Sequence, residues 1–136
     1  MDNSQPDTTG GSSEEPADTP LSALAHEVLR RGGTERAFTS PLNNVKRAGI
    51  FVCAGCGSPL FTSQTKCDSG SGWPSFYAAM PGAVEFERDE RLAEPRTEYH
   101  CAHCGGHQGH VFGDGPNPTG LRFCNNGVAL RFVPKA

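Results

Sequence analysis

Apolar and polar positions divide the chain into one helical segment near its start and a series of short β-like runs after it. The apolar residues of the first segment fall on one helical stripe and are Leu21, Leu24, Val28 and Leu29. Gly32 and Gly33 end the segment, Thr19 is its expected cap, and Pro20 is its expected first helical residue. The sequence therefore predicts a short N-terminal helix that packs through one face.

Beyond Gly33 the apolar residues occur in short runs separated by Gly, Pro and Asn, which is typical of strands joined by turns. The expected strands are 49–53, 59–61, 84–87, 97–101, 122–126 and 128–133. We therefore expect a mainly β domain over residues 19–136, built from antiparallel sheet.

The first 18 residues differ in composition from the rest. They contain five acidic residues, no Lys or Arg, and no large aliphatic or aromatic side chain after Met1. Such a segment buries too little apolar surface to offset the entropy lost on ordering. The sequence predicts a disordered acidic tail over residues 1–18.

Charge and hydropathy argue against two classes of partner. The net charge of −3 comes from the tail, since the remaining residues carry ten acidic and twelve basic side chains. This excess is too small to predict a nucleic-acid groove. No apolar run approaches the roughly 20 residues that cross a bilayer, and the start has no apolar signal core. We expect a cytoplasmic protein that binds neither nucleic acid nor membrane.

Four of the six cysteines repeat one spacing, Cys53-x-x-Cys56-Gly and Cys101-x-x-Cys104-Gly. Two such turns in a small intracellular domain predict a closed four-cysteine site for one structural Zn²⁺. Iron is the alternative metal, and two disulfides or four free thiols are the metal-free alternatives. His103, inside the second turn, is expected to face solvent.

A closed metal site leaves Cys67 and Cys124 as candidates for a reactive thiol. If residues 121–127 form a strand, alternation places Arg122, Cys124 and Asn126 on one face. A guanidinium beside a thiol favours its thiolate, and an amide can hydrogen-bond to the sulfur. This local pattern fits a reactive cysteine and a buried structural cysteine about equally.

Further polar residues precede Cys124 in a glycine-rich segment. His107 and His110 directly follow the second cysteine turn and are suited to proton transfer near neutral pH. Asp114 is placed to orient one imidazole, although turn chemistry alone also explains an Asp there. Trp73, the only tryptophan, is flanked by glycine and is either an apolar wall of a site or a core residue.

Together these segments resemble the B-type methionine sulfoxide reductases, or peptide-methionine (R)-S-oxide reductases. The motifs follow one another from about Leu21 to Phe132: Gly-Thr-Glu, Cys-x-x-Cys-Gly, Ser-Gly-x-Gly-Trp-Pro-Ser-Phe, a second Cys-x-x-Cys, Gly-His-x-Gly-His-Val-Phe, Asp-Gly-Pro-x-Pro-Thr-Gly and Arg-Phe-Cys-x-Asn. The resemblance implies two small antiparallel sheets and reduction of the R epimer of methionine sulfoxide in oxidised proteins.

The resemblance also implies roles for individual residues. Cys124 is the implied nucleophile, and its implied polar network is His107, His110, Asp114, Arg122 and Asn126. Trp73 and Phe112 are the implied pocket for the substrate methyl group. The implied product on the enzyme is a sulfenic acid, which thioredoxin or a similar thiol reduces. A monomer is the expected state.

The chain departs from the family pattern where many relatives carry a recycling cysteine. Ser71 occupies that position, Cys67 lies four residues earlier as the possible resolving thiol, and Gly127 replaces a frequent Ser. The rival interpretation is a zinc-ribbon binding module without catalytic activity. It leaves the two histidines, the isolated Trp73 and the Arg-x-Cys-x-Asn segment unexplained.

Overall fold

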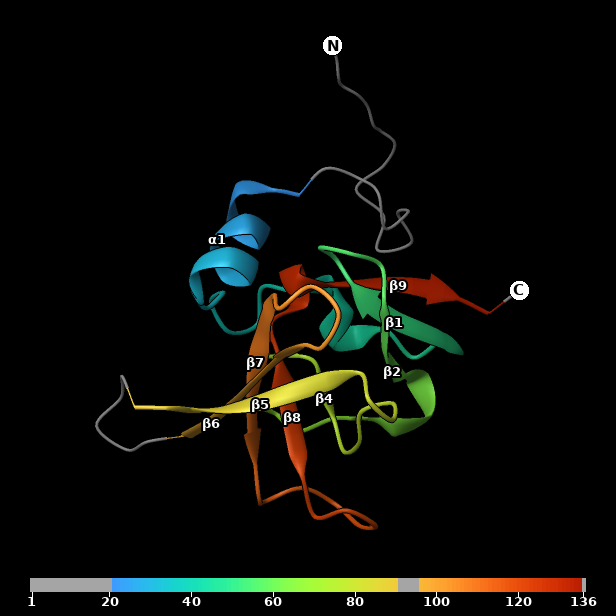
Figure 1. The fold of residues 1–136 in the computed structure, drawn as a ribbon. Helices are drawn as coiled ribbons and strands as arrows, with labels where there is room; N and C mark the ends of the chain where they lie inside the picture. The colour runs from blue at the N-terminus through green and yellow to red at the C-terminus, as the bar shows by residue number, and fades with distance from the viewer. Residues whose placement is uncertain (1–20, 91–95, 136) are drawn as a thin grey trace.

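The structure is a computed structural model that describes residues 21–90 and 96–135 (Figure 1). Its α-helix, α1 (Ala23–Arg31), begins after Ser22, whose hydroxyl accepts a hydrogen bond from the backbone of Ala25 at 3.0 Å. The helix ends at Gly32, which has a φ of 70° and donates to two helix carbonyls. The expected start at Thr19 and Pro20 is wrong, because Ser22 supplies the cap. The tail predicted over residues 1–18 lies outside the described residues.

Most of the expected strands are confirmed within one or two residues. The strands are β1 (Gly49–Cys53), β2 (Pro59–Thr62), β3 (Lys66–Cys67), β4 (Ser75–Phe76), β5 (Val84–Asp89), β6 (Arg96–Cys101), β7 (His107–Phe112), β8 (Arg122–Asn125) and β9 (Leu130–Pro134). Short 3-10 helices cover Pro41–Asn44, Ser63–Thr65 and Gly127–Ala129. The pattern missed β3, β4 and β7, and the last 3-10 helix replaces the expected start of β9.

Within the described residues the strands form two antiparallel sheets, which confirms the predicted fold class. The smaller sheet has the order β2-β1-β9, and the larger has the order β3-β4-β8-β7-β6-β5. Strand β8 therefore lies inside the larger sheet, with β4 on one side and β7 on the other (Figure 1).

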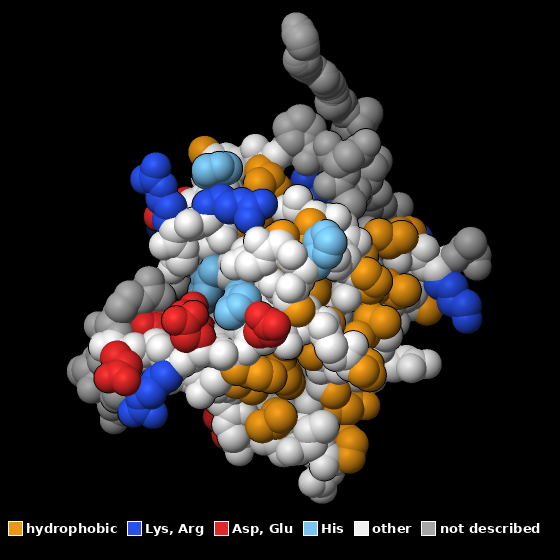
Figure 2. All heavy atoms as spheres, viewed as in Figure 1, with side chains coloured by type: hydrophobic (Ala, Val, Ile, Leu, Met, Phe, Trp, Pro, Cys, Tyr) orange, Lys and Arg blue, Asp and Glu red, His pale blue; other side chains and the backbone are white. Residues whose placement is uncertain are grey.

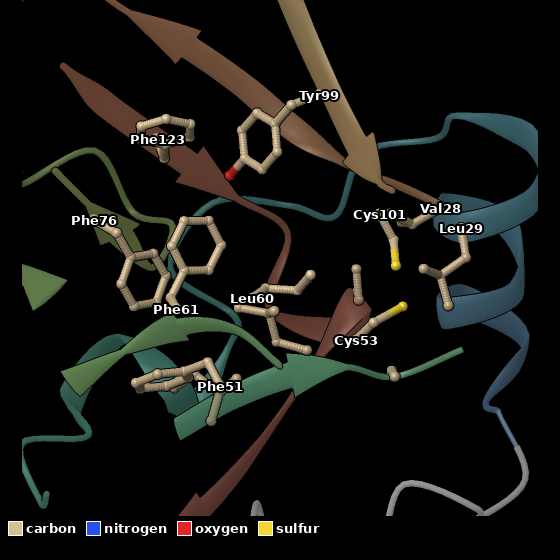
Figure 3. Close-up of a cluster of buried hydrophobic side chains, with 14 of the residues drawn as sticks. Val28, Leu29, Phe51, Cys53, Leu60, Phe61, Phe76, Tyr99, Cys101 and Phe123 are labelled. Carbon is tan, nitrogen blue, oxygen red and sulfur yellow. The ribbon is translucent and has the colours of Figure 1, made fainter. Parts of the chain in front are cut away.

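An aromatic cluster joins the two sheets (Figure 3). Phe61 of β2 stacks on Phe76 of β4 with ring centroids 4.1 Å apart. Tyr99 and Phe123, from β6 and β8, meet edge to face at 5.2 Å. Because Phe123 packs into this core, its neighbour Cys124 is directed to the other face of the sheet.

Helix α1 closes the other end of the core through Val28 and Leu29, beside Cys53 and Cys101 (Figure 3). On the surface, hydrophobic side chains gather over β1, β2 and β4, and histidine and acidic side chains lie together nearer β5 and β7 (Figure 2). Over residues 21–90 and 96–135, no helix combines the length and the apolar composition needed to cross a membrane.

Candidate active site

The four cysteines predicted to bind a metal converge at the end of the core beside α1. Their sulfur atoms all lie within 4.8 Å of one another, and Cys53–Cys104 and Cys56–Cys101 are separated by 3.7 and 3.6 Å. Disulfide sulfurs are bonded at about 2.05 Å. Thiolates around a tetrahedral metal at about 2.3 Å are about 3.8 Å apart. The four sulfurs therefore fit one tetrahedral metal ion.

The residues around this four-cysteine site supply hydrogen-bond donors to the sulfur atoms and no fifth metal ligand among the described residues. Backbone N–H groups of Gly55 and Gly106 donate to the sulfurs of Cys53 and Cys104 at 3.3 and 3.4 Å. His103 is exposed and is not among the grouped ligands, as expected. Donors of this kind stabilise metal-bound thiolates.

Cys124 lies in the middle of β8, half-buried and on the face opposite the aromatic core. Its register partners are Ser75 on β4 and His110 on β7. Residues paired directly across antiparallel strands point to the same face, so all three side chains share one side of the sheet. A Cβ at Gly109 would overlap the carbonyl oxygen of Cys124, so only glycine allows β7 to approach β8 this closely.

A cleft of about 610 Å³ opens over Cys124. Its described lining consists of Gly32, Thr34, Ser71, Trp73, Asp89, Arg96, Gly109, His110, Phe112, Arg122, Cys124 and Asn126. The predicted residues Trp73 and Phe112 thus line one cavity with the thiol. The Arg122 guanidinium lies over the Phe112 ring at 4.4 Å and fixes the orientation of this apolar wall.

Burial sets the protonation of Cys124. It raises the pKa of the thiol above its ordinary value, and this effect outweighs a hydrogen bond from Ser71 and the positive charge of Arg122, both of which lower it. The Ser71 hydroxyl lies 3.8 Å from the sulfur. Arg122 therefore favours the thiolate as expected, but the resting group is a thiol at neutral pH.

Asp114 orients Arg122 and not an imidazole. Its two carboxylate oxygens accept hydrogen bonds from Nε and Nη2 of Arg122 at 2.8 and 3.3 Å. This contact lowers the pKa of Asp114 and raises that of Arg122. The expectation that Asp114 orients a histidine is wrong, because the turn places it beside the guanidinium.

The two histidines are brought together by a bulge in β7. His100 pairs with His107 and Tyr99 with Gly109, so Gln108 is an extra residue that shifts the alternation. His107 and His110, three positions apart, consequently have ring centroids only 5.6 Å apart.

Acidic partners that the sequence pattern did not identify hold both imidazoles. Asp89 at the end of β5 is buried and lies 2.9 Å from Nε2 of His110. Glu98 on β6 lies 2.8 Å from Nδ1 of His107. A carboxylate fixes the ring orientation of a neighbouring imidazole. These residues meet only through the pairing register of the strands. The local sequence pattern therefore gives no indication that Asp89 and Glu98 belong to the site.

Asn126 is buried, and both the oxygen and the nitrogen of its side-chain amide are hydrogen-bonded. Its Oδ1 accepts from the backbone of Glu35 at 2.8 Å, and its Nδ2 donates to the carbonyl of Gln108 at 3.0 Å. The Glu35 carbonyl accepts from Nε1 of Trp73 at 3.0 Å, and the Glu35 carboxylate accepts from the backbone of Gly127 and Val128. Glu35, present in the Gly-Thr-Glu motif but assigned no role from it, is therefore the residue that holds Trp73 and Asn126 together.

Cys67 lies on β3, the edge strand of the larger sheet, and is paired with Ser75. It opens onto a second cavity of about 510 Å³, which shares Ser71 and Arg122 with the main cleft. Burial raises the pKa of the Cys67 thiol, against the opposing charge of Lys66.

Comparison with known proteins gives consistent similarities over nearly the whole described chain. The family model described as "SelR domain" matches residues 21–134. Peptide methionine sulfoxide reductase MsrB of Agrobacterium fabrum is 53% identical over 115 residues, covering 84% of this chain and 85% of that protein. MsrB of Bradyrhizobium diazoefficiens is 52% identical over 124 residues, covering 90% and 89%. Mouse methionine-R-sulfoxide reductase B3, mitochondrial, is 46% identical over 115 residues, covering 84% and 46%.

Proposed function

The chain belongs to the SelR domain family, and from this premise we propose that it is a peptide-methionine (R)-S-oxide reductase. It reduces methionine-R-sulfoxide in proteins to methionine. The observation that carries the proposal is the placement of Cys124 in a cleft of about 610 Å³ with a guanidinium, an imidazole and an aromatic wall beside it.

Cys124 supplies the attacking thiol in this proposal. Its sulfur attacks the sulfoxide sulfur and forms a transient S–S bond while the oxygen takes up the thiol proton. The S–S and S–O bonds then break, the hydroxyl group ends on the Cys124 sulfur, and methionine leaves. Thiol and sulfoxide thus give a sulfenic acid and methionine, with atoms and electrons balanced and no further reactant. Because the resting thiol keeps its proton, that proton is available for the sulfoxide oxygen.

The polar residues around Cys124 have proposed roles in proton transfer, positioning and charge stabilisation. His110, held by Asp89 and paired with Cys124 across β7 and β8, is placed to carry the proton from sulfur to oxygen. His107 and its partner Glu98 lie behind it and position it. Arg122, fixed by Asp114, stabilises negative charge on the sulfur or the oxygen.

The substrate methyl group is proposed to lie against Trp73 and Phe112. Both side chains line the cleft, and the Trp73 indole is fixed by its hydrogen bond to Glu35. Asn126 lines the same cleft and completes the polar side of the site. An apolar wall on one side and polar groups on the other suit a side chain that carries a methyl group and a polar S–O group.

Regeneration requires two thiols per turnover, which leave as a disulfide while the oxygen leaves as water. Thioredoxin or a similar reductant is the proposed source. Cys67 is proposed as the resolving thiol, with a Cys67–Cys124 disulfide as the intermediate that the reductant opens.

Zn²⁺ is the proposed metal of the four-cysteine site formed by Cys53, Cys56, Cys101 and Cys104. Four thiolates close the coordination sphere, so the ion supplies folding free energy and no chemistry on the substrate. Elemental analysis of the purified protein distinguishes zinc from iron.

We propose that the protein acts in the cytoplasm, as a monomer. Four of its cysteines are grouped as metal ligands, and Cys67 and Cys124 are free thiols, which suits a reducing compartment.

The assay that tests the proposed activity compares peptides carrying the two sulfoxide epimers. With a thiol reductant present, we expect methionine from the R epimer only, and none from either epimer with Cys124→Ser. Equal turnover of both epimers, or full activity of Cys124→Ser, would contradict the assignment.

A further inference from the structure

Gln108 lies between the two histidines, at the unspecified position of the Gly-His-x-Gly-His motif, and the structure buries it completely. It is the extra residue of the β7 bulge, so it has no partner in the β6–β7 register. Burying an amide side chain is unfavourable unless its polar atoms are hydrogen-bonded. The partners of Gln108 therefore indicate why an amide occupies this position.

A directed chain of hydrogen bonds runs through Gln108 to the metal site. The hydroxyl of Tyr99 donates to Oδ1 of Asn125 at 2.7 Å, and Nδ2 of Asn125 donates to Oε1 of Gln108 at 3.1 Å. Nε2 of Gln108 then donates to the sulfur of Cys53 at 3.4 Å. All three hydrogen bonds are donated in the direction of the sulfur. A metal-bound thiolate can only accept hydrogen bonds, so a series of hydrogen bonds that ends on one must run in this direction.

Gln108 also holds strand β8 through its backbone. Its carbonyl oxygen accepts from the backbone N–H of Asn126 at 2.8 Å and from Nδ2 of the same residue at 3.0 Å. With the side-chain contact to Asn125, both residues that follow Cys124 are bonded to Gln108. One residue thus contacts a metal ligand on one side and the catalytic strand on the other.

We propose that Gln108 is a positioning residue that couples the metal site to strand β8, so that the metal bound at Cys53 sets the position of the strand carrying Cys124. The inference rests on the proposed roles of Cys124 and of the four-cysteine site. A close-packed interior transmits small displacements, and donors to a ligand orient it in turn. Movement of the Cys53 sulfur therefore reaches Asn125 through the amide side chain of Gln108, and Asn126 through the backbone carbonyl of the same residue.

Three zinc-loaded variants separate coupling from a local effect. Ser58→Ala removes a hydroxyl 3.3 Å from the Cys56 sulfur, a contact on the metal side alone. Tyr99→Phe removes the hydroxyl that contacts Asn125, on the strand side alone. Gln108→Met keeps the length of the side chain and removes its contacts to Cys53 and Asn125, while the backbone contacts to Asn126 stay in place.

Two rates are measured on each variant: zinc release to a chromogenic chelator, and hydrogen exchange of the Asn125 and Asn126 amides. We expect Ser58→Ala to accelerate release more than exchange, and Tyr99→Phe to accelerate exchange more than release. Gln108→Met should accelerate both by about threefold to tenfold, the change expected for loss of one hydrogen bond. It should also lower kcat more than it changes KM, because the cleft lining is untouched.

Replacing Zn²⁺ by the larger Cd²⁺ tests the coupling itself. In the wild type and in Tyr99→Phe, the Asn125 and Asn126 amides should exchange at different rates in the two metal forms. In Gln108→Met this metal dependence should disappear. If Gln108→Met proves too unstable to purify, the same comparison is made on Gln108→Leu.

The proposal is overturned if the Gln108 variants change only one of the two rates, or if the metal dependence of exchange survives in them. Neither rate depends on substrate. An inactive wild type that keeps the metal-dependent exchange would therefore contradict the proposed reductase function and leave the coupling standing.

Discussion

Cys67 and Cys124 face the same side of the six-stranded sheet with one strand between them, because both are paired with Ser75. Two strand spacings place their Cα atoms about 9.5 Å apart. A disulfide needs Cα atoms within about 7 Å. The two thiols therefore meet only if β3, which is two residues long, separates from β4.

We predict that Cys67→Ser keeps its turnover with dithiothreitol and loses most of its turnover with thioredoxin. The reason is that a small thiol can enter the cleft and reduce the sulfenic acid directly, whereas the protein reductant acts on the exposed disulfide. Steady-state rates with the two reductants provide the measurement. Mass spectrometry of the wild type after one turnover without reductant should show a Cys67–Cys124 disulfide.

The control for this prediction uses Ser71, whose hydroxyl is already 3.8 Å from the Cys124 sulfur. Adding Ser71→Cys to Cys67→Ser provides a thiol that needs no strand separation, and thioredoxin-driven turnover should return. Unchanged thioredoxin-driven turnover in Cys67→Ser alone would show that Cys67 has no resolving role.

The second prediction concerns proton transfer. His110→Ala should lower kcat about 10²–10⁴-fold, since this is the usual contribution of a general acid or base. His100→Ala is the matched control, because His100 lies on β6 beside Glu85, outside the cleft lining. Single-turnover rates on an R-sulfoxide peptide distinguish them, and equal rates in the two variants would exclude a proton-transfer role for His110.

The third prediction concerns the pH dependence of Cys124. Burial raises its pKa, so alkylation by iodoacetamide should increase with pH and have its midpoint above that of a free cysteine. Arg122→Met removes a positive charge that lowers this pKa, so its midpoint should lie higher still. Arg88→Met, at an exposed position that pairs with Glu90, should leave the midpoint unchanged. A midpoint in Arg122→Met equal to or below that of the wild type would refute the electrostatic role.

The fourth prediction concerns Glu35. Its carboxylate accepts from the backbone N–H groups of Gly127 and Val128, and Gln offers one acceptor atom in place of two. Glu35→Gln should lower the free energy of unfolding by about 1–3 kcal/mol. The fluorescence emission of Trp73, the only tryptophan, should shift to longer wavelength. The reason is that the backbone at Glu35, whose carbonyl accepts a hydrogen bond from Nε1 of Trp73, becomes less rigidly held. Glu27→Gln, on the exposed side of α1, should change neither quantity.

The Glu35 comparison also has a defined pH dependence. Burial raises the pKa of Glu35 in the folded protein above its unfolded value, so the folded state takes up the proton first as pH falls. The additional stabilisation that comes from protonating Glu35 is complete below the pKa of the unfolded state. It is lost as pH rises through the higher pKa of the folded state. The stability difference between wild type and Glu35→Gln should therefore widen between pH 7 and pH 4. A difference that narrows would contradict this direction.

The predictable parts of the fold are those whose apolar residues alone reveal the element. β1 is predicted to the residue, since its apolar run is bounded by Gly49 at one end and by the first Cys-x-x-Cys turn at the other. β7 was missed because it contains two histidines, a glutamine and a glycine, and it is a strand through its pairing with β6 and β8. β3 and β4 are two residues long, too short for any periodicity to appear.

The candidate site divides in the same way. The four-cysteine site and Cys124 have local signatures, and the cleft gathers Trp73 and Phe112 as the resemblance implied. Asp89 and Glu98 contribute through a register that spans three strands, which no local pattern encodes. The sequence predicts an imidazole as the partner of Asp114, but the structure places Arg122 there. The two residues are eight positions apart and meet only through the turn between them, which the sequence pattern does not reveal.

The sulfur of a sulfoxide is a stereocentre, and a protein can tell its two configurations apart only if the surrounding groups keep fixed relative positions. Glu35 fixes two of them, since its carbonyl holds the indole of Trp73 and its N–H holds the side chain of Asn126. Because one residue is bonded to both, we expect the two groups to keep their relative positions only while Glu35 stays in place. Selection of one sulfur configuration is therefore expected to depend on a buried glutamate that is not among the residues lining the cleft.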